Sequence, residues 1–430
     1  MSLAAFNPCW IDALGCALAA SVALSCTPVA PEAPQPACPP MKIAAPSPST
    51  ASPAFTSFDD DLAFLTRHGT LKVLTTPSGA RVAISPQYQA RVMTSAVEPG
   101  GRSLGFINRK FIEEGKTGTQ FDNYGGEDRF WLGPEGGQFG LYFPSQKPFV
   151  FDNWQTPHAL QEGSWDVVRE SASSVTFSHV MTLSNYAGRE FKIEITREIA
   201  LLTPERAAEQ LGVAVPAGVQ WVGISSSNTL KNVGSAPWLD SGGLLSVWIL
   251  GMFAPVAGTR VIVPFDKNGA GEIVNDRYFG KVPADRLSVQ ADQGYLLFRA
   301  DGQYRSKIGL GPTRAKSALG SYSDEAKLLT LVLYSKPSGA TRYVNSMWEL
   351  QKEPYGGDVV NSYNDGPPAP GKPSLGGFYE IESSSPATAL APGESLTHVH
   401  TTYHFSGPRE ALDILAQRVL GVSLASLPPG

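Results

Sequence analysis

The chain has 430 residues, of which 42% are hydrophobic and 17% charged, with a formal net charge of −5. That length suits one large β or α/β unit or two to three ordinary domains, and an aromatic content of 10% argues against disorder over most of it. A mildly acidic sequence without basic runs is a poor candidate for nucleic-acid binding, because neutralising phosphates requires clustered Lys and Arg; we expect no nucleic-acid partner.

Residues 1–26 resemble a bacterial export signal. An apolar run from Ala13 ends in ALSC at Cys26 and is too short to span a bilayer permanently. Its end is similar to the lipobox of lipoproteins, which makes Cys26 the expected lipidated residue. The preceding segment lacks Lys and Arg, unlike most signal peptides, so an apolar disordered N-terminus is the alternative. We expect an exported protein, periplasmic or anchored to the outer membrane, that touches the membrane only through this lipid.

Residues 27–55 are dense in Pro, Ala and Ser, a composition that favours extended chain, so we expect a linker there. One continuous domain is expected over residues 56–430, since no further Pro/Ser linker interrupts it. The four cysteines all precede residue 39. The domain therefore has no disulfide, thiolate metal site or cysteine nucleophile.

Short β-rich runs bounded by Gly and Pro dominate the domain. Helices are predicted over 58–68, 108–114, 204–211 and 408–419. Strands are predicted over 70–76, 80–86, 90–97, 129–133, 139–143, 164–171, 174–184, 190–202, 218–230, 244–253, 259–265, 294–300, 327–335, 376–383 and 395–405. So many strands with few helices predict an all-β architecture, and the lack of a fixed repeat disfavours propellers and solenoids.

Two stretches resemble the galactose-mutarotase-like superfamily. NTLKNVGSAPW (228–238) is similar to a strand–turn–strand with an N-x-G pivot, and ALAPGESLTHVHTTYHFSG (389–407) is similar to the superfamily's C-terminal ending. Residues 56–420 as a whole look like a secreted bacterial branch of it. The resemblance implies a large antiparallel β-supersandwich and a carbohydrate ligand. Motifs carrying the catalytic His and Glu of aldose epimerases are missing, so mutarotase activity is not implied.

Residues 125–140 (GGEDRFWLGPEGGQFG) concentrate polar and aromatic side chains between glycines, which let a backbone approach a ligand closely. Carboxylates there can act as acid and base, and a Trp face can stack on a pyranose ring. If 129–133 is a strand, Arg129 and Trp131 share one face and Asp128 faces the other way. A structural Asp128–Arg129 ion pair beside a core Trp131 is the alternative. The candidates are Glu135 for catalysis and Glu127, Arg129 and Trp131 for substrate binding.

His398 and His400 have even spacing, so both project from one face of the predicted C-terminal strand. Glu380 and Glu382 share a face of the preceding strand, and a hairpin would set them beside the histidines. Glu380, His398 and His400 then suit a divalent metal, although no cofactor is assigned. As an acid–base group, Glu380 and His400 would be catalytic, with His398 and Glu382 contacting substrate. Surface or core-satisfied histidines are the alternative.

Two further loops carry candidate substrate-binding residues. Asn361, in the predicted turn-rich loop NSYNDGP with Asn364 and Asp365, offers an amide ligand, while a plain Asx turn is equally expected. Trp154 and His158, in DNWQTPH, would form a subsite wall. Signatures of nucleotide cofactors and serine hydrolases do not occur in a usable context.

These observations predict an exported carbohydrate-active enzyme, namely an epimerase, lyase or glycosidase that uses carboxylate and His acid–base chemistry. A non-catalytic glycan-binding lipoprotein and a structural envelope component are the alternatives. We expect residues 125–140 and the Glu380/His400 strand pair to converge on one concave face, with Glu135 and His400 within about 15 Å. Proximity of like charges would raise one carboxyl pKa toward neutrality. The sequence does not specify the sugar or the oligomeric state.

Overall fold

The computed structural model describes residues 55–118, 120–161 and 163–428. The predicted signal peptide, Cys26 and all of the linker except its last residue lie outside the described residues. None of the described helices combines the length and the apolar character that crossing a bilayer requires.

Three sheets make up the described fold, and every pairing between their strands is antiparallel. The ten-stranded sheet runs β11 (Leu287–Gln290), β12 (Tyr295–Arg299), β10 (Arg260–Pro264), β14 (Ala318–Ser323), β15 (Leu328–Tyr334), β18 (Ser395–Ser406), β8 (Gln220–Asn232), β7 (Glu190–Leu201), β6 (Ser174–Ser184) and β5 (Asp166–Glu170). The five-stranded sheet runs β13 (Ser306–Leu310), β16 (Val360–Asn364), β17 (Tyr379–Ser384), β9 (Ser246–Phe253) and β4 (Arg129–Gly133). The smallest sheet runs β1 (Lys72–Thr75), β2 (Arg81–Ser85) and β3 (Arg91–Ala96). The predicted all-β, antiparallel supersandwich with a few short helices is confirmed.

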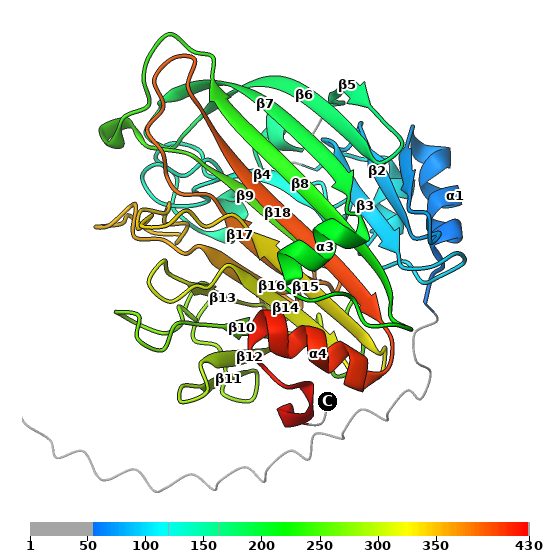
Figure 1. Ribbon diagram of the computed structural model, residues 1–430. Helices are drawn as coiled ribbons and strands as arrows, with labels where there is room; N and C mark the ends of the chain where they lie inside the picture. Colours follow the sequence, from blue (N-terminus) through cyan, green and yellow to red (C-terminus); the bar gives the residue numbers. More distant parts are fainter. Residues whose placement is uncertain (1–54, 119, 162, 429–430) are drawn as a thin grey trace, which may run out of the picture. The chain divides into compact units, whose positions relative to one another are not determined.

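The helices are short; they are α1 (Phe58–His68), α2 (Arg109–Glu114), α3 (Pro204–Leu211) and α4 (Arg409–Leu420), with 3₁₀ turns at Phe151–Asn153, His158–Leu160, Asp240–Gly242 and Leu424–Ser426. Of these, α3 and α4 lie over one face of the ten-stranded sheet (Figure 1). Both α1 and α3 match their predicted bounds. Each begins where a hydroxyl caps the first turn, since Ser57 accepts from the Asp60 amide and Thr203 from the Arg206 amide.

Two predicted local structures are wrong. Residues 139–143 form no strand, because the chain turns back over itself and the amides of Leu141 and Tyr142 donate to the carbonyls of Pro134 and Glu135. The first four residues of the predicted loop NSYNDGP (361–364) belong instead to strand β16, which pairs with β13 on one side and β17 on the other, and only residues 365–367 lie outside a strand. At β16, pairing with distant strands outweighs the local composition.

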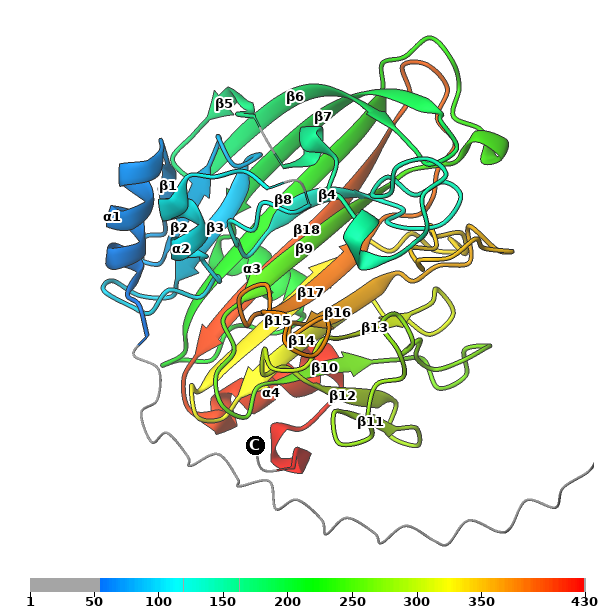
Figure 2. The ribbon, with the colours of Figure 1, turned by 180° about the vertical axis from the view of Figure 1, so that it is seen from behind.

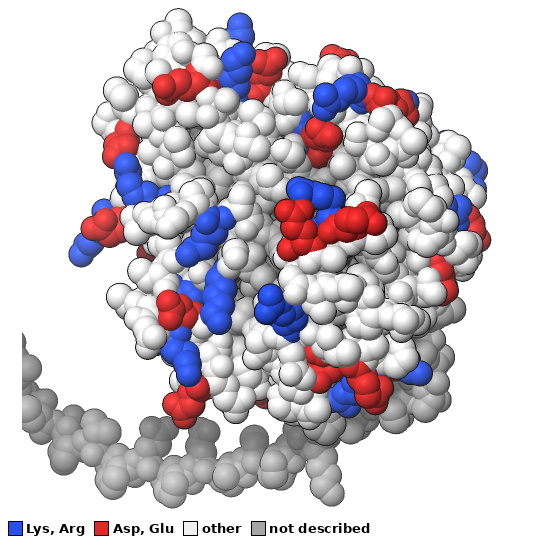
Figure 3. Space-filling model, viewed as in Figure 1, with Lys and Arg blue, Asp and Glu red and all other residues white. Residues whose placement is uncertain are grey.

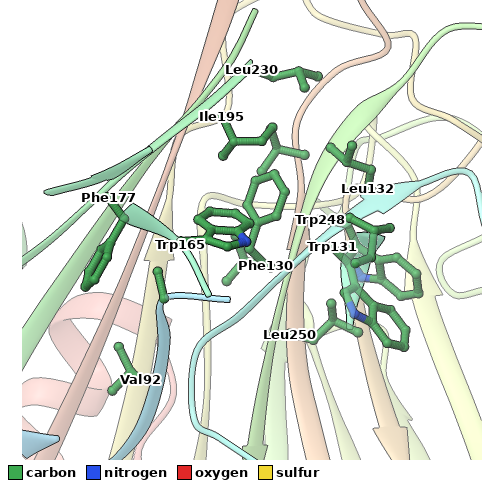
Figure 4. Packing of buried hydrophobic residues seen from close by; sticks show 14 of the residues in the cluster. Val92, Phe130, Trp131, Leu132, Trp165, Phe177, Ile195, Leu230, Trp248 and Leu250 are labelled. Atoms are coloured by element: carbon green, nitrogen blue, oxygen red, sulfur yellow. The ribbon is translucent and has the colours of Figure 1, made fainter. Parts of the chain in front are cut away.

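The main core lies between the inner face of the five-stranded sheet and the ten-stranded sheet. Phe130 of β4 packs against Trp165 with ring centres 5.5 Å apart, and Ile195 and Leu230 belong to the same cluster (Figure 4). On the other face of the ten-stranded sheet, α3 and α4 bury a second cluster that includes Leu412 (Figure 1). Burial of each such side chain stabilises the folded state by about 1.5–3 kcal/mol. Over the face seen in Figure 3, Lys and Arg are interspersed with Asp and Glu.

The unfolding temperature of the domain is expected to be insensitive to reductant, because no cysteine follows residue 38. Thermal melts of a chain that begins near Phe55, recorded by circular dichroism with and without dithiothreitol, check this. A melting temperature that falls on adding dithiothreitol would refute it.

Candidate functional site: an aromatic cleft on the five-stranded sheet

The outer face of the five-stranded sheet, which points away from the ten-stranded sheet, carries aromatic and charged side chains. Side chains alternate along a strand, so Arg129 and Trp131 of β4 point outward while Phe130 points into the core, as predicted. Trp248 of β9 lies directly across from Trp131 in the register, with ring centres 5.6 Å apart (Figure 4). The two tryptophans therefore stand side by side on this face.

Strand register also assembles charges on the outer face. On one row, Lys307 of β13 lies opposite Tyr363 of β16, which lies opposite Glu380 of β17. On the neighbouring row, Glu382 of β17 is separated from Arg129 of β4 by one residue of β9. Lys307 and Arg129, on the two edge strands, therefore lie near the carboxylates of the central strand β17.

Loops rise around this face and enclose a cleft of about 490 Å³ of empty space, its open mouth included. The loop that follows β4 lies beside β9 and β17 (Figure 2). Most of the lining is aromatic: Phe121, Trp131, Phe151, Trp154, Trp248, Phe279, Trp348, Tyr363 and Phe378. The remaining lining residues are Leu250, Leu375, Arg129, Glu135, Arg305, Lys307 and Glu380.

Glu380 forms a buried ion pair, with its Oε1 2.8 Å from Nη2 of Arg129. Burial raises the pKa of Glu380 to about 7, although the Arg129 guanidinium opposes the rise and the charge of Glu382 adds to it. Glu380 is therefore partly protonated near neutral pH, and a cation beside it stabilises its ionised form.

Glu382 and Lys307 form a second buried pair, with Nζ 2.9 Å from Oε2. The indole N–H of Trp248 donates to the same oxygen at 2.8 Å. Burial alone would lower the pKa of Lys307, but the negative charges of Glu382, Glu135 and Glu380 raise it above its ordinary value. Lys307 therefore stays charged in the cleft.

Glu135 is the third carboxylate, and its Oε1 accepts a hydrogen bond from the Trp154 indole at 2.8 Å. Burial raises the pKa of Glu135, Glu382 adds to the rise, and Lys307 and hydrogen bonds from Trp348 and Trp154 oppose it. Two buried carboxyl groups with raised pKa values thus share one aromatic cleft. Such groups suit proton transfer to and from a bound molecule.

Several predicted site residues do come together. The cleft brings Glu135, Arg129 and Trp131 next to Glu380, so the expected convergence is met for these residues. It is not met for His400, which lies on the opposite face of β17 from the cleft. Trp154 forms part of the wall, and Glu382 holds the lysine that lines it.

The predicted hairpin between Glu380/Glu382 and the histidines is wrong, because β17 and β18 belong to different sheets. His398 and His400 both hydrogen bond to Ser383 Oγ at 2.8 Å, and Ser383 alternates with the two glutamates on β17 and so points the opposite way. Burial lowers the pKa of His398 to about 3 and that of His400 to about 4, so both are neutral at neutral pH. His400 does not line the cleft.

The predicted metal set of Glu380, His398 and His400 is not assembled, for the same reason. Among residues 55–118, 120–161 and 163–428, no group of three or more His, Cys, Asp or Glu side chains is placed to hold a metal ion. Ser383 occupies the position between the two imidazoles where the sequence suggested a shared ion.

Four other candidates lie outside the cleft lining. Glu127 is buried between the sheets, with Oε2 3.3 Å from Nε2 of His404. His158 begins the 3₁₀ turn after Trp154 and does not reach the cleft. Asn361 shares the outer face but donates to the Tyr278 hydroxyl and the Ile308 carbonyl. Asn364, in the same strand, donates to the Tyr304 carbonyl.

Lys307, Arg305 and Trp348 line the cleft, and the sequence analysis missed them. No local motif marks them, because strand register and loop closure bring them to residues distant in sequence. A signal that the sequence does offer is Trp248 in the predicted strand 244–253, because the indole of Trp combines a large apolar ring with an N–H donor and suits a ligand-binding surface.

Solved structures similar to this chain have low sequence identity. The Slr1438 protein from Synechocystis is 12% identical, with 79% of this chain and 96% of that chain covered and a TM-score of 0.46. A galactose mutarotase related enzyme from Lactobacillus acidophilus is 12% identical (79% and 98% covered, TM-score 0.42). A galactose mutarotase-like protein from Lactobacillus casei is 12% identical (78% and 100% covered, TM-score 0.43). No curated protein matches the chain.

The sequence also matches a protein family described as a family of unknown function (DUF6786). The match extends over residues 56–428, which include every strand of the three sheets and every residue of the cleft. The chain therefore belongs to the DUF6786 family.

Proposed function

We propose that the chain is an exported carbohydrate-active protein and that the cleft on the five-stranded sheet binds a sugar ring. The observation that carries the proposal is the combination of a largely aromatic wall with three buried glutamates, Glu135, Glu380 and Glu382. Aromatic faces stack on the C–H faces of a pyranose, and carboxylates accept hydrogen bonds from its hydroxyls. The same combination is not needed to stabilise a sandwich core.

Polar atoms without a partner support a polyhydroxylated ligand. Trp131 Nε1, Arg129 Nη1 and Glu382 Oε1 are buried and find no hydrogen-bond partner among the described residues. Unsatisfied buried polar groups cost about 1–3 kcal/mol each, so a ligand that supplies acceptors to the two lining residues Trp131 and Arg129, and a donor to Glu382 behind them, would bind favourably. Sugar hydroxyls supply both.

We further propose that the protein is an enzyme, an epimerase, lyase or glycosidase, with Glu380 as the proton donor. Its pKa of about 7 keeps a proton available at neutral pH, and Arg129 stabilises the carboxylate that remains after transfer. Glu135 is the second acid–base group. His400 can affect the reaction only indirectly, because it contacts Ser383 on the side of β17 that faces away from the cleft.

The test is to incubate the purified protein with a panel of neutral and acidic mono- and oligosaccharides and to follow each by NMR. A product that appears with the wild-type chain and not with Glu135→Gln supports the enzymatic proposal. If no sugar in the panel is converted or bound, both the enzymatic and the carbohydrate-binding proposals fail.

A non-catalytic glycan-binding protein is the second candidate, favoured by the pairing of both β17 glutamates with cations. Glu380 contacts Arg129 and Glu382 contacts Lys307, so these carboxylates already have partners and can serve to position the site. This candidate predicts sugar affinity that survives Glu135→Gln and Glu380→Gln, since binding needs no proton donor. Isothermal titration calorimetry on both variants measures this affinity, and the absence of any product with a sugar that the wild-type chain binds separates this candidate from the enzyme.

Export and lipid attachment are proposed from the sequence around Cys26. Cys26→Ala is expected to abolish membrane association and to leave the soluble domain folded, because stable attachment depends on acyl chains that the alanine cannot carry. Membrane fractionation with immunodetection measures the first effect, and circular dichroism of the released protein measures the second. Unchanged membrane partitioning of the variant would rule out the lipid anchor.

A further inference from the structure

One of the three cations that line the cleft has no acidic partner. Arg129 is paired with Glu380 and Lys307 with Glu382. Arg305 forms no ion pair with any carboxylate of the part of the chain that the structure describes, and its buried Nε has no hydrogen-bond partner there. Its positive charge is therefore uncompensated at the cleft wall.

Aromatic rings hold this guanidinium in place. The Arg305 guanidinium carbon lies 3.6 Å from the ring centre of Phe279, 5.3 Å from that of Phe151 and 5.6 Å from that of Trp348. Stacking on such rings orients the planar group, which also hydrogen bonds to the Tyr363 side chain, and its other N–H groups can donate to an acceptor on a ligand. A guanidinium fixed in this way matches the geometry of a carboxylate or a sulfate, which it binds through two parallel hydrogen bonds.

A second hollow adjoins the cleft and shares Phe279 and Arg305 with it. It holds about 880 Å³ of empty space, open solvent included. Its lining contains two cations, Arg305 and Lys372, and no Asp or Glu; the other lining residues are Gln303, Tyr304 and residues 367–371. Arg305 therefore stands at the junction of an aromatic cleft and a positively charged outer hollow.

We propose, building on the carbohydrate function proposed above, that the ligand is an acidic oligosaccharide of at least two sugar units. One unit stacks in the aromatic cleft, and an anionic group on the chain, a carboxylate or a sulfate, binds Arg305. The outer hollow holds the continuing chain near Lys372. A neutral sugar would leave the charge of Arg305 uncompensated, and a monosaccharide would fill only one of the two spaces.

The experiment titrates the full chain, by calorimetry, with pairs of oligosaccharides that differ only in charge. One pair is tetragalacturonate and its fully methyl-esterified form, and the other is a sulfated carrageenan tetrasaccharide, whose sugar units carry no carboxylate, and its desulfated form. The charged member of at least one pair is expected to bind at least about 10-fold more tightly, and the preferred pair identifies carboxylate or sulfate. The preference should weaken as salt is added.

Variants test the assignment to Arg305. Arg305→Gln is expected to remove the charge preference with a loss of about 10- to 100-fold for the acidic member, while binding of the neutral member changes little. Arg305→Lys should keep part of the preference because it keeps the charge, and Lys372→Gln should reduce it by a smaller factor. Arg206→Gln, an exposed arginine on α3, is the matched control and should leave binding unchanged.

Equal binding of charged and neutral members, or a preference that persists in Arg305→Gln, would overturn the inference and leave the carbohydrate proposal standing. If no oligosaccharide of either kind binds the wild-type chain, the carbohydrate proposal fails and the inference fails with it. If Arg305→Gln does not fold, as judged by circular dichroism, the inference is still tested by the wild-type comparison of each pair and by the Arg305→Lys variant.

Discussion

Glu380→Gln is expected to lower turnover of the sugar substrate by about 10²- to 10⁴-fold, the range found when a general acid is removed. The amide keeps the size of the side chain but cannot donate the proton, and it loses the ion pair with Arg129. Affinity for the sugar should change far less than turnover. Steady-state kinetics that separate kcat from KM measure both effects, with exposed Glu170→Gln as the matched control.

The raised pKa of Glu380 also predicts how the activity and the stability of the protein change with pH. The folded-state pKa of Glu380 is raised from 4.5 to about 7, so a proton donor at this position becomes ionised, and activity should fall, as the pH rises through about 7. By linkage, the free energy of unfolding should also decline between about pH 4.5 and pH 7, because the folded state binds the proton more tightly. In Glu380→Gln the fall of activity should vanish and the decline in stability should become shallower, although Glu135, whose pKa is also raised, still contributes to that decline. Persistence of the falling limb in that variant would assign the proton to another group.

Asp128→Ala is expected to lower the free energy of unfolding by about 3–5 kcal/mol, because it leaves a buried guanidinium without its counter-charge. Arg197 of β7 is fully buried between the sheets, where it contacts the Asp128 carboxylate, the Asn228 side chain and the Ala90 carbonyl. The ion pair crosses from the ten-stranded sheet to the start of β4, the strand that carries Arg129. Loss of Asp128 should therefore also loosen the cleft.

Urea denaturation followed by fluorescence measures this loss of stability. Arg169→Ala is the matched control, because Arg169 pairs with Glu198 on the same sheet but is largely exposed, and such pairs contribute about 0–1 kcal/mol. Similar losses for the two variants would show that the inter-sheet pair does not stabilise the sandwich more than a surface pair does.

The sequence predicts those parts of the fold that depend on local signals. The predicted helices over 58–68 and 204–211 match α1 and α3, and the alternation of RFWLG places Arg129 and Trp131 on one face. Both depend on residues adjacent in the chain, so no knowledge of tertiary partners is needed.

The parts that fail depend on which strands become neighbours. Even spacing correctly aligns His398 and His400, but it cannot show that β18 pairs with β8 and β15 and not with β17. The local composition of the polar run VNSYN predicts a turn, but the run forms a strand because β13 and β17 pair with it on either side. Lys307 reaches Glu382 only through that same register. Sheet order is a non-local property, and a single sequence carries little information about it.

The most direct test of the central claim, that the aromatic cleft binds sugar, uses the indole N–H resonances of the tryptophans in ¹⁵N-labelled protein. Trp131, Trp154, Trp248 and Trp348 line the cleft, whereas Trp165, Trp221 and Trp238 contact other residues away from it. Titration with neutral and acidic oligosaccharides should shift the resonances of the first four and leave the other three in place. Binding that shifts only Trp165, Trp221 or Trp238, or none of the cleft tryptophans, would contradict the account.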